Sequence, residues 1–450
     1  MAKNVDGLKI AMHNLGCKTN SYEMDVMGQK LREAGAVIVP FNEEADVYII
    51  NTCTVTNIAD RKSRQMLHKA KKENPNAIVV AVGCYVETGK EGVIKDESID
   101  LAVGNNKKSE IVEILDEFIE IRDSADDKTL HGTSIIDINH TDKYEEMMLS
   151  ELPEHTRAYI KIQDGCNQFC TYCVIPYARG RVRSRDMDNV LEEIRALAKK
   201  GCKEVVLTGI HISSYGAEKG QQLLVPLVEK MNEIEGIERI RLGSLEPRFV
   251  TKENVIRLSK LDKLCPHFHL SLQSGCDSVL HRMNRHYNTD EFREGVAYLR
   301  EYFDTPAITT DIIVGFPGET EEEFEECRKF AEEIAFYEMH VFKYSPRKGT
   351  VAAGMKDQLT DKEKSARSDV LLDLTKKQSE CYRSNFVGKE LSVLWEDEER
   401  VDGKRYMIGH TDRYVRVACP VGDGSASCAV SGDITTVTPR SFLNSDTLLI

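Results

Sequence analysis

Three thiols stand in one short stretch, Cys166-Asn-Gln-Phe-Cys170-Thr-Tyr-Cys173, directly after the β-rich run 157–162 and the turn residues Asp164 and Gly165. A closed structural zinc site takes four protein ligands, and this spacing supplies three. Iron–sulfur clusters are also built on Cys thiolates, and a [4Fe-4S] cluster on three cysteines keeps one iron free for another ligand. The stretch therefore predicts a metal centre at a strand end. A zinc knuckle or unrelated core cysteines are the alternatives.

Size and composition exclude some classes of protein. A length of 450 residues suggests about two to four domains, and 41% hydrophobic residues suffice for a folded core. No apolar run reaches the roughly 18 residues of a membrane span, and the first residues lack a signal-peptide pattern. We expect a cytoplasmic protein with no membrane partner. The net charge of −14 argues against a generic nucleic-acid coat, although a local basic path is compatible with it.

Residues 7–122 alternate strands with helices, which predicts a doubly wound α/β domain with a parallel sheet. Strands are expected at Lys9–His13, Asp46–Asn51, Ile78–Val82 and Leu101–Gly104, and Val37–Pro40 is a short apolar run. Cys17, Cys53 and Cys84 each follow the end of one of these strands. Because the C-terminal ends of parallel strands border one crevice, the three thiols are predicted to converge there. Three separate buried thiols are the alternative.

Residues 123–150 are polar and acidic and are expected to link two domains. Residues 151–383 then repeat a strand and a helix six times, which predicts a partial (β/α)6 barrel with its active residues at the C-terminal strand ends. The strands are expected at Ala158–Ile162, Glu204–Leu207, Arg239–Leu242, His267–Leu272, Ile308–Val314 and Met339–Phe342. At or near these ends lie Thr208, Gly209, Ser244, Glu246, Gln273, Asp311, Gly315 and Tyr344. Glu246 and Gly315 have a purely structural alternative as turn residues.

Four arginines follow the cysteine loop at alternate positions: Arg179, Arg181, Arg183 and Arg185. Side chains with this spacing cannot all face a core, and a guanidinium offers forked donors for phosphate. An RNA backbone is the expected partner. Internal ion pairs or a bound carboxylate are the alternatives.

Residues 384–450 have short strand-like runs between turn residues, which predicts a small β-barrel. The strands are expected at Leu391–Trp395, Arg405–Ile408, Tyr414–Val417 and Ile434–Val437. From residue 385 on, seven Lys and Arg face ten Asp and Glu, so RNA binding would need a local patch that includes Arg405 and Arg413. A barrel that only buttresses the core is the alternative.

The motifs resemble those of the methylthiotransferase family of radical S-adenosylmethionine (SAM) enzymes, in the same order along nearly the whole chain. They are Leu15-Gly-Cys-Lys-Thr-Asn20, Asn51-Thr-Cys-Thr-Val-Thr56, Val82-Gly-Cys-Tyr85 and the loop that begins at Cys166. The resemblance implies that Cys17, Cys53 and Cys84 hold an auxiliary [4Fe-4S] cluster that carries the sulfur. It implies that Cys166, Cys170 and Cys173 hold a second [4Fe-4S] cluster that binds SAM among the strand-end residues of the core. It also implies a C-terminal RNA-binding TRAM domain.

Within the family, the residues around Lys18 look most like the subgroup that adds a methylthio group to C2 of N6-threonylcarbamoyladenosine at position 37 of tRNA. Because this C2–H is neither acidic nor electrophilic, radical chemistry is expected. The resemblance implies two SAM molecules, the tRNA anticodon stem-loop as substrate, and an electron donor such as flavodoxin or ferredoxin; the sulfur source is not implied. The alternatives are another adenosine-37 derivative, a ribosomal protein aspartate, or a non-catalytic RNA-binding metalloprotein.

Overall fold

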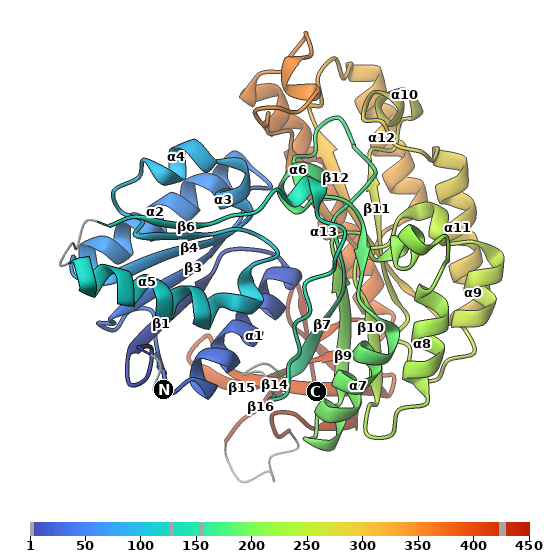
Figure 1. The fold of residues 1–450 in the computed structure, drawn as a ribbon. Helices are drawn as coiled ribbons and strands as arrows, with labels where there is room; N and C mark the ends of the chain where they lie inside the picture. Colours follow the sequence, from blue (N-terminus) through green and yellow to red (C-terminus); the bar gives the residue numbers. More distant parts are fainter. Residues whose placement is uncertain (1–3, 126–129, 153–155, 423–428) are drawn as a thin grey trace.

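Strand order divides the chain into three parts in the computed structural model, which describes residues 4–125, 130–152, 156–422 and 429–450 (Figure 1). The N-terminal part, blue to teal in Figure 1, lies beside the green and yellow core. The red C-terminal strands lie under the core. Among the described residues, no helix is both long and apolar enough to cross a bilayer.

The N-terminal sheet has the order β2-β1-β3-β4-β5-β6, and its neighbouring strands are all parallel. Helices α2, α3 and α4 cover one face, and α1 and α5 cover the other (Figure 1), so the predicted doubly wound domain is confirmed. Because both faces are covered, β3 and β4 are buried along their whole length. The strands are β1 (Lys9–Asn14), β2 (Val37–Val39), β3 (Val47–Thr52), β4 (Ile78–Gly83), β5 (Leu101–Val103) and β6 (Gly132–Ser134). The helices are α1 (Lys18–Glu33), α2 (Asn57–Glu73), α3 (Cys84–Thr88), α4 (Lys90–Ile94) and α5 (Ile111–Ala125).

The segment expected to be a polar link, residues 123–150, takes part in this domain. Helix α5 ends at Ala125, and β6 pairs with β5 as a sixth strand within the described residues. Met147 and Leu149 are buried in the main hydrophobic core. This corrects the expected link. A strand of three residues at a sheet edge shows no periodicity in sequence, so only its pairing reveals it.

The core is the wall of a partial barrel. Strands β7, β9 and β10 are parallel neighbours, as are β11, β12 and β13, and two bridges, Ile240–Leu264 and Leu245–Leu270, join the two groups. The six predicted strands are all present, and the short β8 adds an antiparallel edge to β7. The strands are β7 (Arg157–Asp164), β8 (Arg183–Ser184), β9 (Glu204–Gly209), β10 (Arg239–Leu242), β11 (His267–Gln273), β12 (Ala307–Val314) and β13 (Glu338–Lys343).

Helices cover the outer, convex face of this wall (Figure 1). Capping boxes at Asn288, Thr320 and Thr360 begin α11, α12 and α13, because each cap and its glutamate satisfy amides that the first turn leaves free. The concave face of the wall faces the N-terminal part. Helix α6 (Ile175–Arg179) lies instead next to α3 of the N-terminal part. The other helices of the core are α7 (Met187–Lys199), α8 (Leu224–Asn232), α9 (Lys252–Leu258), α10 (Asp277–Arg282), α11 (Thr289–Tyr302), α12 (Glu321–Ile334) and α13 (Asp361–Ser384).

The C-terminal sheet has the order β17-β14-β15-β16-β19-β18, antiparallel except where β16 meets β19. Trp395 is fully buried in its core. The four expected strands are present, and β18 and β19 complete the sheet at the end of the chain. The strands are β14 (Leu391–Val401), β15 (Lys404–Thr411), β16 (Arg416–Pro420), β17 (Ile434–Val437), β18 (Ser441–Asn444) and β19 (Thr447–Leu449).

A buried ion cluster attaches this sheet to the floor of the barrel. Glu204 of β9 lies 3.1 Å from Arg241 and 3.5 Å from Arg239, both on β10. The two arginines also donate across the interface, Arg239 to the Ser392 carbonyl (2.7 Å) and Arg241 to the Asp412 carbonyl (2.9 Å). Burial alone would raise the pKa of Glu204, but the charges of Arg241, Arg157 and Arg239 together outweigh it and hold the pKa at about 2.

Candidate functional site

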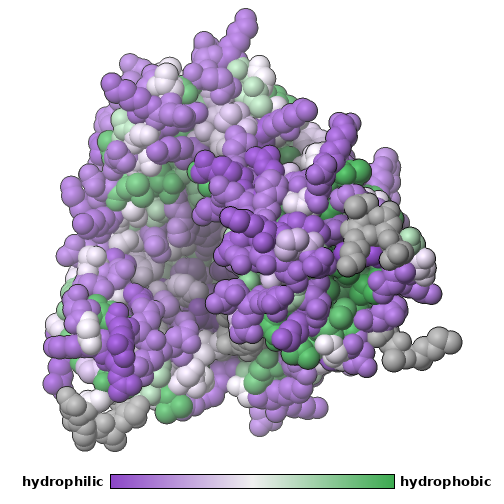
Figure 2. All heavy atoms as spheres, turned by 90° about the vertical axis from the view of Figure 1, so that its left-hand side faces the viewer, coloured by the Kyte–Doolittle hydropathy of each residue, from purple (hydrophilic) through white to green (hydrophobic). Residues whose placement is uncertain are grey.

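One cavity of about 390 Å³ lies between the N-terminal part and the concave face of the core. Its lining includes Cys17 of the N-terminal part and Cys166, Cys170 and Cys173 of the core loop. The face of the molecule in Figure 2 is largely hydrophilic and is hollowed near its middle. Thiols from both predicted metal sites therefore open onto the same cavity.

The first set of thiols, Cys17, Cys53 and Cys84, is assembled by strand register. Thr52 at the end of β3 lies opposite Gly83 at the end of β4, so Cys53 and Cys84 leave adjacent strands side by side. Cys17 precedes α1 after the neighbouring β1. Burial, and then the charge of Cys84, raises the pKa of Cys53 to about 11, and the charge of Cys17 adds to this effect. The structure thus brings together the three cysteines that the sequence predicted would converge.

The second set, Cys166, Cys170 and Cys173, lies in the tight loop after β7. Gly165 has a φ of +73°, and a Cβ there would lie 1.8 Å from the Arg181 carbonyl oxygen, so only glycine allows the loop to close. Burial raises the pKa of Cys166 to about 11 and that of Cys173 to about 12. At neutral pH these two thiols are therefore protonated without a metal, and loading a metal centre must release their protons.

Each set of thiols receives one guanidinium hydrogen bond. Arg179 Nε donates to Cys84 Sγ at 3.2 Å, and Arg285 Nη1 donates to Cys170 Sγ at 3.2 Å. A [4Fe-4S] cluster held by three thiolates carries net negative charge, and hydrogen bonds to its sulfurs tune it. The donor sets therefore fit two iron–sulfur clusters. No sequence motif marked Arg285, because the contact spans 115 residues.

Arg179 also belongs to a fully buried ion network between the two parts of the chain. Its guanidinium donates to Glu23 of α1 at 2.5 Å and lies 3.3 Å from Asp164. Lys108 and Lys161 bond to the same glutamate. Burial alone would raise the pKa of Glu23, but the charges of Arg179 and the two lysines hold it well below the usual range. This network fixes the N-terminal part against the core beside Cys84.

The structure corrects the expected contact with RNA for three of the four arginines after the loop. Arg179, Arg183 and Arg185 are 0%, 1% and 1% exposed, and their guanidiniums face the buried carboxylates of Glu23, Asp164 and Glu193. Internal ion pairs, the alternative reading of the sequence, account for these three. Arg181 alone of the four is exposed, and its guanidinium lies 4.5 Å above the Phe169 ring.

Six of the eight residues expected around SAM line the cavity that holds the second set of thiols. They are Gly209, Ser244, Glu246, Gln273, Asp311 and Tyr344. The Tyr344 hydroxyl and His211 Nε2 also lie at this wall, buried and without a hydrogen-bond partner within the described residues. Burial raises the pKa of Tyr344 to about 12 and lowers that of His211 to about 4, so both are neutral at pH 7. Unsatisfied polar atoms of this kind fit a polar ligand.

Thr208 and Gly315 are not in this lining. The Thr208 hydroxyl lies 3.4 Å from that of Thr19, so it contacts the N-terminal part. Gly315 has a φ of +71°, its amide donates to Glu319 at 2.7 Å, and a Cβ would lie 2.4 Å from Lys364 Cγ. Gly315 therefore makes the turn before α12, as the structural alternative expected.

The two C-terminal arginines have different surroundings. Arg405 is 49% exposed and lies 3.3 Å from Glu398. Arg413 donates to the backbone carbonyls of Asp304 (2.8 Å) and Thr305 (3.1 Å) in the core. Arg413 therefore holds the C-terminal sheet to the core, which corrects its expected place in an RNA patch.

Two family models match the chain. Residues 160–331 match the Radical SAM superfamily, and residues 9–104 match Uncharacterized protein family UPF0004. The chain is 42% identical to the threonylcarbamoyladenosine tRNA methylthiotransferase MtaB of Aquifex aeolicus, over 91% of this chain and 98% of that protein. It is 38% identical to MtaB of Bacillus subtilis, over 91% and 89%. It is 35% identical to the tRNA-2-methylthio-N(6)-dimethylallyladenosine synthase of Clostridium tetani, over 88% and 87%.

Solved structures share the fold at low identity. The radical SAM methyltransferase TsrM from Kitasatospora setae superposes with a TM-score of 0.55 at 15% identity, over 76% of this chain and 77% of that chain. The cobalamin-dependent radical SAM enzyme OxsB gives 0.51 at 12% identity, over 84% and 56%. These two likenesses concern the fold alone, whereas the curated relatives match at 35–42% identity over most of both chains. The chain belongs to the methylthiotransferase family of radical SAM enzymes.

Proposed function

We propose that this protein adds a methylthio group to C2 of N6-threonylcarbamoyladenosine at position 37 of tRNA, with two SAM molecules and two [4Fe-4S] clusters. The observation that carries the proposal is the one cavity onto which Cys17 and the loop Cys166–Cys173 both open. A base in that cavity can reach both metal sites without leaving the protein. The relatives named MtaB support the choice of the modified adenosine.

Cys17, Cys53 and Cys84 would hold one cluster, and the three cysteines of the loop after β7 would hold the other. When bound, the clusters supply the one-electron cleavage of SAM and the sulfur that is transferred. Arg179 and Arg285 offset the negative charge of the thiolates through the 3.2 Å bonds to their sulfurs. These two arginines therefore stabilise the loaded state of the protein.

The cavity wall would bind SAM through a small polar set, with Ser244, Glu246 and Gln273 as the residues nearest its polar groups. Gln273 has a φ of +69°, an uncommon conformation for a residue other than glycine that concentrates at functional sites. Apolar side chains such as Ile313 and Phe342 complete the wall and exclude water.

An exposed patch beside the cysteine loop is the proposed contact with the anticodon stem-loop. Phe169 and Tyr177 are 37% and 46% exposed, and their rings lie 6.2 Å apart, with Arg181 over Phe169. Unstacked RNA bases are held by aromatic rings and guanidinium planes. The C-terminal sheet, as a TRAM domain, would add a separate RNA contact through Arg405. A cytoplasmic location and a flavodoxin or ferredoxin as electron donor complete the proposal.

Mass spectrometry of tRNA nucleosides tests the proposal. In a strain without the gene, the methylthio derivative of threonylcarbamoyladenosine should disappear from tRNA. Threonylcarbamoyladenosine without the methylthio group should accumulate instead. The wild-type gene should restore the group, and Cys84→Ala or Cys166→Ala should not. Cys381→Ala, which changes an exposed free cysteine, is the matched control and should restore it. Unchanged tRNA together with an altered ribosomal protein aspartate would overturn the proposal.

The purified variants separate the two metal sites. After anaerobic reconstitution, the wild-type protein should bind about eight irons and each cysteine variant about four. Cys84→Ala should still cleave SAM, because the loop Cys166–Cys173 is intact, and Cys166→Ala should not. SAM cleavage by both variants would contradict the assignment.

A further inference from the structure

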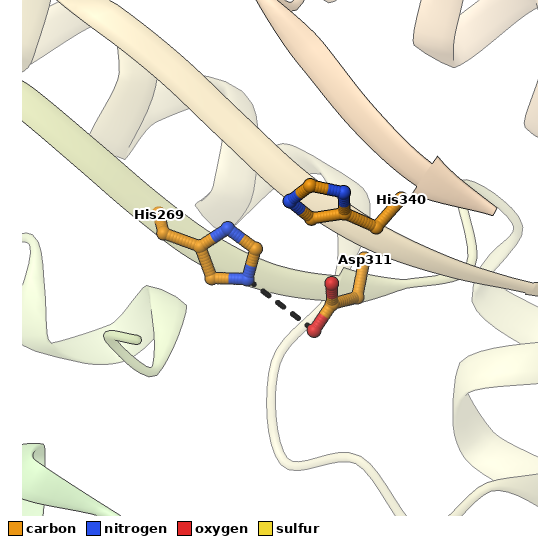
Figure 3. Close-up of side chains that lie close together, drawn as sticks. All are labelled: His269, Asp311 and His340. Atoms are coloured by element: carbon orange, nitrogen blue, oxygen red, sulfur yellow. Dashed lines mark ion pairs between the residues drawn. The ribbon is translucent and has the colours of Figure 1, made fainter. Parts of the chain in front are cut away.

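Two histidines and an aspartate meet on the concave face of the core (Figure 3). His269 lies on β11, Asp311 on β12 and His340 on β13, three neighbouring parallel strands. In the sheet register Thr309 lies opposite His269, and Asp311 lies opposite His340. Because alternate residues of a strand share a face, Thr309 and Asp311 point the same way, and the three side chains converge.

Their donor atoms are close enough to share one ion after a small adjustment. One donor atom from each of the three side chains lies within 4.8 Å of the other two. His269 Nε2 is 3.3 Å from an Asp311 carboxylate oxygen, and the two imidazole centroids are 5.7 Å apart. His340 is exposed, so its ring has room to turn toward the other two. Two imidazoles and a carboxylate are a donor set for zinc and for ferrous iron.

A buried neighbour fixes the orientation of His269. Its Nδ1 lies 3.0 Å from the hydroxyl of Thr309, which is 3% exposed. This contact leaves Nε2 directed at Asp311, as Figure 3 shows. Histidines that bind metals usually have the other ring nitrogen held in this way, which sets the tautomer and the ring plane.

The cluster is more buried at His269 and opens onto the cavity at Asp311. The His269 side chain is 13% exposed and that of Asp311 28%, and Asp311 also lines the cavity that holds the cysteines. A metal site of this form keeps a coordination position for water or for an oxygen of a ligand in the cavity. Among the described residues, no hydrogen bond or ion pair engages the imidazole of His340. The ion pair between His269 and Asp311 therefore gives no reason for the imidazole of His340 to lie beside them.

We propose that His269, Asp311 and His340 bind one divalent metal ion of borderline character, zinc or ferrous iron. The site is distinct from both sets of cysteines, and it does not depend on the activity proposed above.

Metal analysis of the cluster-loaded protein tests the site. Protein reconstituted anaerobically with iron and sulfide is incubated with Zn²⁺, freed of unbound metal and analysed for both metals. The wild type should hold about one zinc beside about eight irons per chain. His340→Ala should lose the zinc and keep the iron. Thr309→Val, which releases His269, should weaken zinc binding about 10- to 100-fold.

His281→Ala is the matched control, because this exposed histidine of α10 lies outside the cluster, and it should keep both metals. An additional high-spin ferrous ion in the Mössbauer spectrum, lost in His340→Ala, would support the site as ferrous. Zinc that persists in His340→Ala belongs to the cysteines and overturns the site. A wild-type protein that binds neither zinc nor an additional ferrous ion also overturns it and leaves an ion pair of His269 and Asp311.

Discussion

Arg179 has a different role from Arg181, although both follow the same loop. It is fully buried, donates to Cys84 Sγ and to Glu23, and so touches a predicted metal ligand and the other part of the chain at once. Removal of one member of a buried ion network leaves the remaining charges unpaired, which costs more than the pair contributes. We therefore expect Arg179 to help retain the cluster and to stabilise the folded protein.

Arg179→Gln should lower the free energy of unfolding by about 3–5 kcal/mol and release iron from the site that contains Cys84. Arg179→Lys should recover only part of both, because an ammonium cannot reach Cys84 and Glu23 as a fork. Denaturant unfolding and iron content per chain measure the two effects. Arg181→Gln, an exposed control, should change stability by no more than about 0.5 kcal/mol. Full iron content in Arg179→Gln would contradict the role.

The junction of β4 with α3 shows how an element places a ligand. Gly83 ends β4 with a φ of +99°, and a Cβ there would lie 2.6 Å from Asn51 Oδ1 and 2.8 Å from the Thr52 carbonyl oxygen. The close approach of β3 and β4 at this point keeps Cys53 beside Cys84. Glycine is thus required here for two reasons, the backbone conformation and the space.

Gly83→Ala should push β4 away from β3 and lower the iron content of the first cysteine site, while the second site stays loaded. Gly201→Ala is the matched control, because Gly201 has a φ of +94° and nothing within 4 Å of the added Cβ. The control should lose about 1–2 kcal/mol of stability from its backbone conformation and keep all its iron. Iron analysis and unfolding curves of both variants check this. Equal behaviour of the two would refute the steric argument.

At the level of elements, the long strands and some short ones, such as β5, could be predicted, whereas four other short strands could not. The buried run of β4 and the six parallel strands of the core are continuous or alternating apolar patterns, and each was predicted near its observed position. Strands β6, β8, β18 and β19 have two to four residues each, and pairing with a neighbour defines them. A pattern of this length carries no period that distinguishes a strand from a loop.

The three parts of the molecule are joined by buried charges rather than by apolar surface alone. Glu23 and Arg179 join the N-terminal part to the core, and Glu204 with Arg239 and Arg241 joins the core to the C-terminal sheet. Both groups are fully or almost fully buried. Ion clusters of this kind impose a specific arrangement of the parts, because any other packing leaves a charge without its partner.

Glu204 gives the assembly a dependence on pH. Its pKa of about 2 lies below the ordinary value of 4.5, so the ionised cluster contributes stability above about pH 4.5. That contribution, on the order of 3 kcal/mol, is lost as the pH falls from about 4.5 to about 2. Glu204→Gln should be less stable than wild type at pH 7, and the difference should shrink through this window. Glu398→Gln, at the more exposed pair with Arg405, should show no such convergence in unfolding curves. A constant difference between Glu204→Gln and wild type would refute the assignment.

The sequence by itself determined the local and topological features. Cysteine spacing predicted one metal loop, and the position of Cys17, Cys53 and Cys84 after parallel strands predicted the other site, because the strands of such a sheet all end at the same edge. The family followed from the order of these motifs, and the comparisons confirmed it.

Only the tertiary structure decided which distant side chains serve the site. Arg285 reaches Cys170 across 115 residues, and the His269, Asp311 and His340 set depends on the register of three strands. The burial of Arg179, Arg183 and Arg185 likewise depends on the carboxylates that surround them. Sequence spacing limits only what neighbouring residues can do, and the partner of a charge buried between two domains is set by how those domains pack.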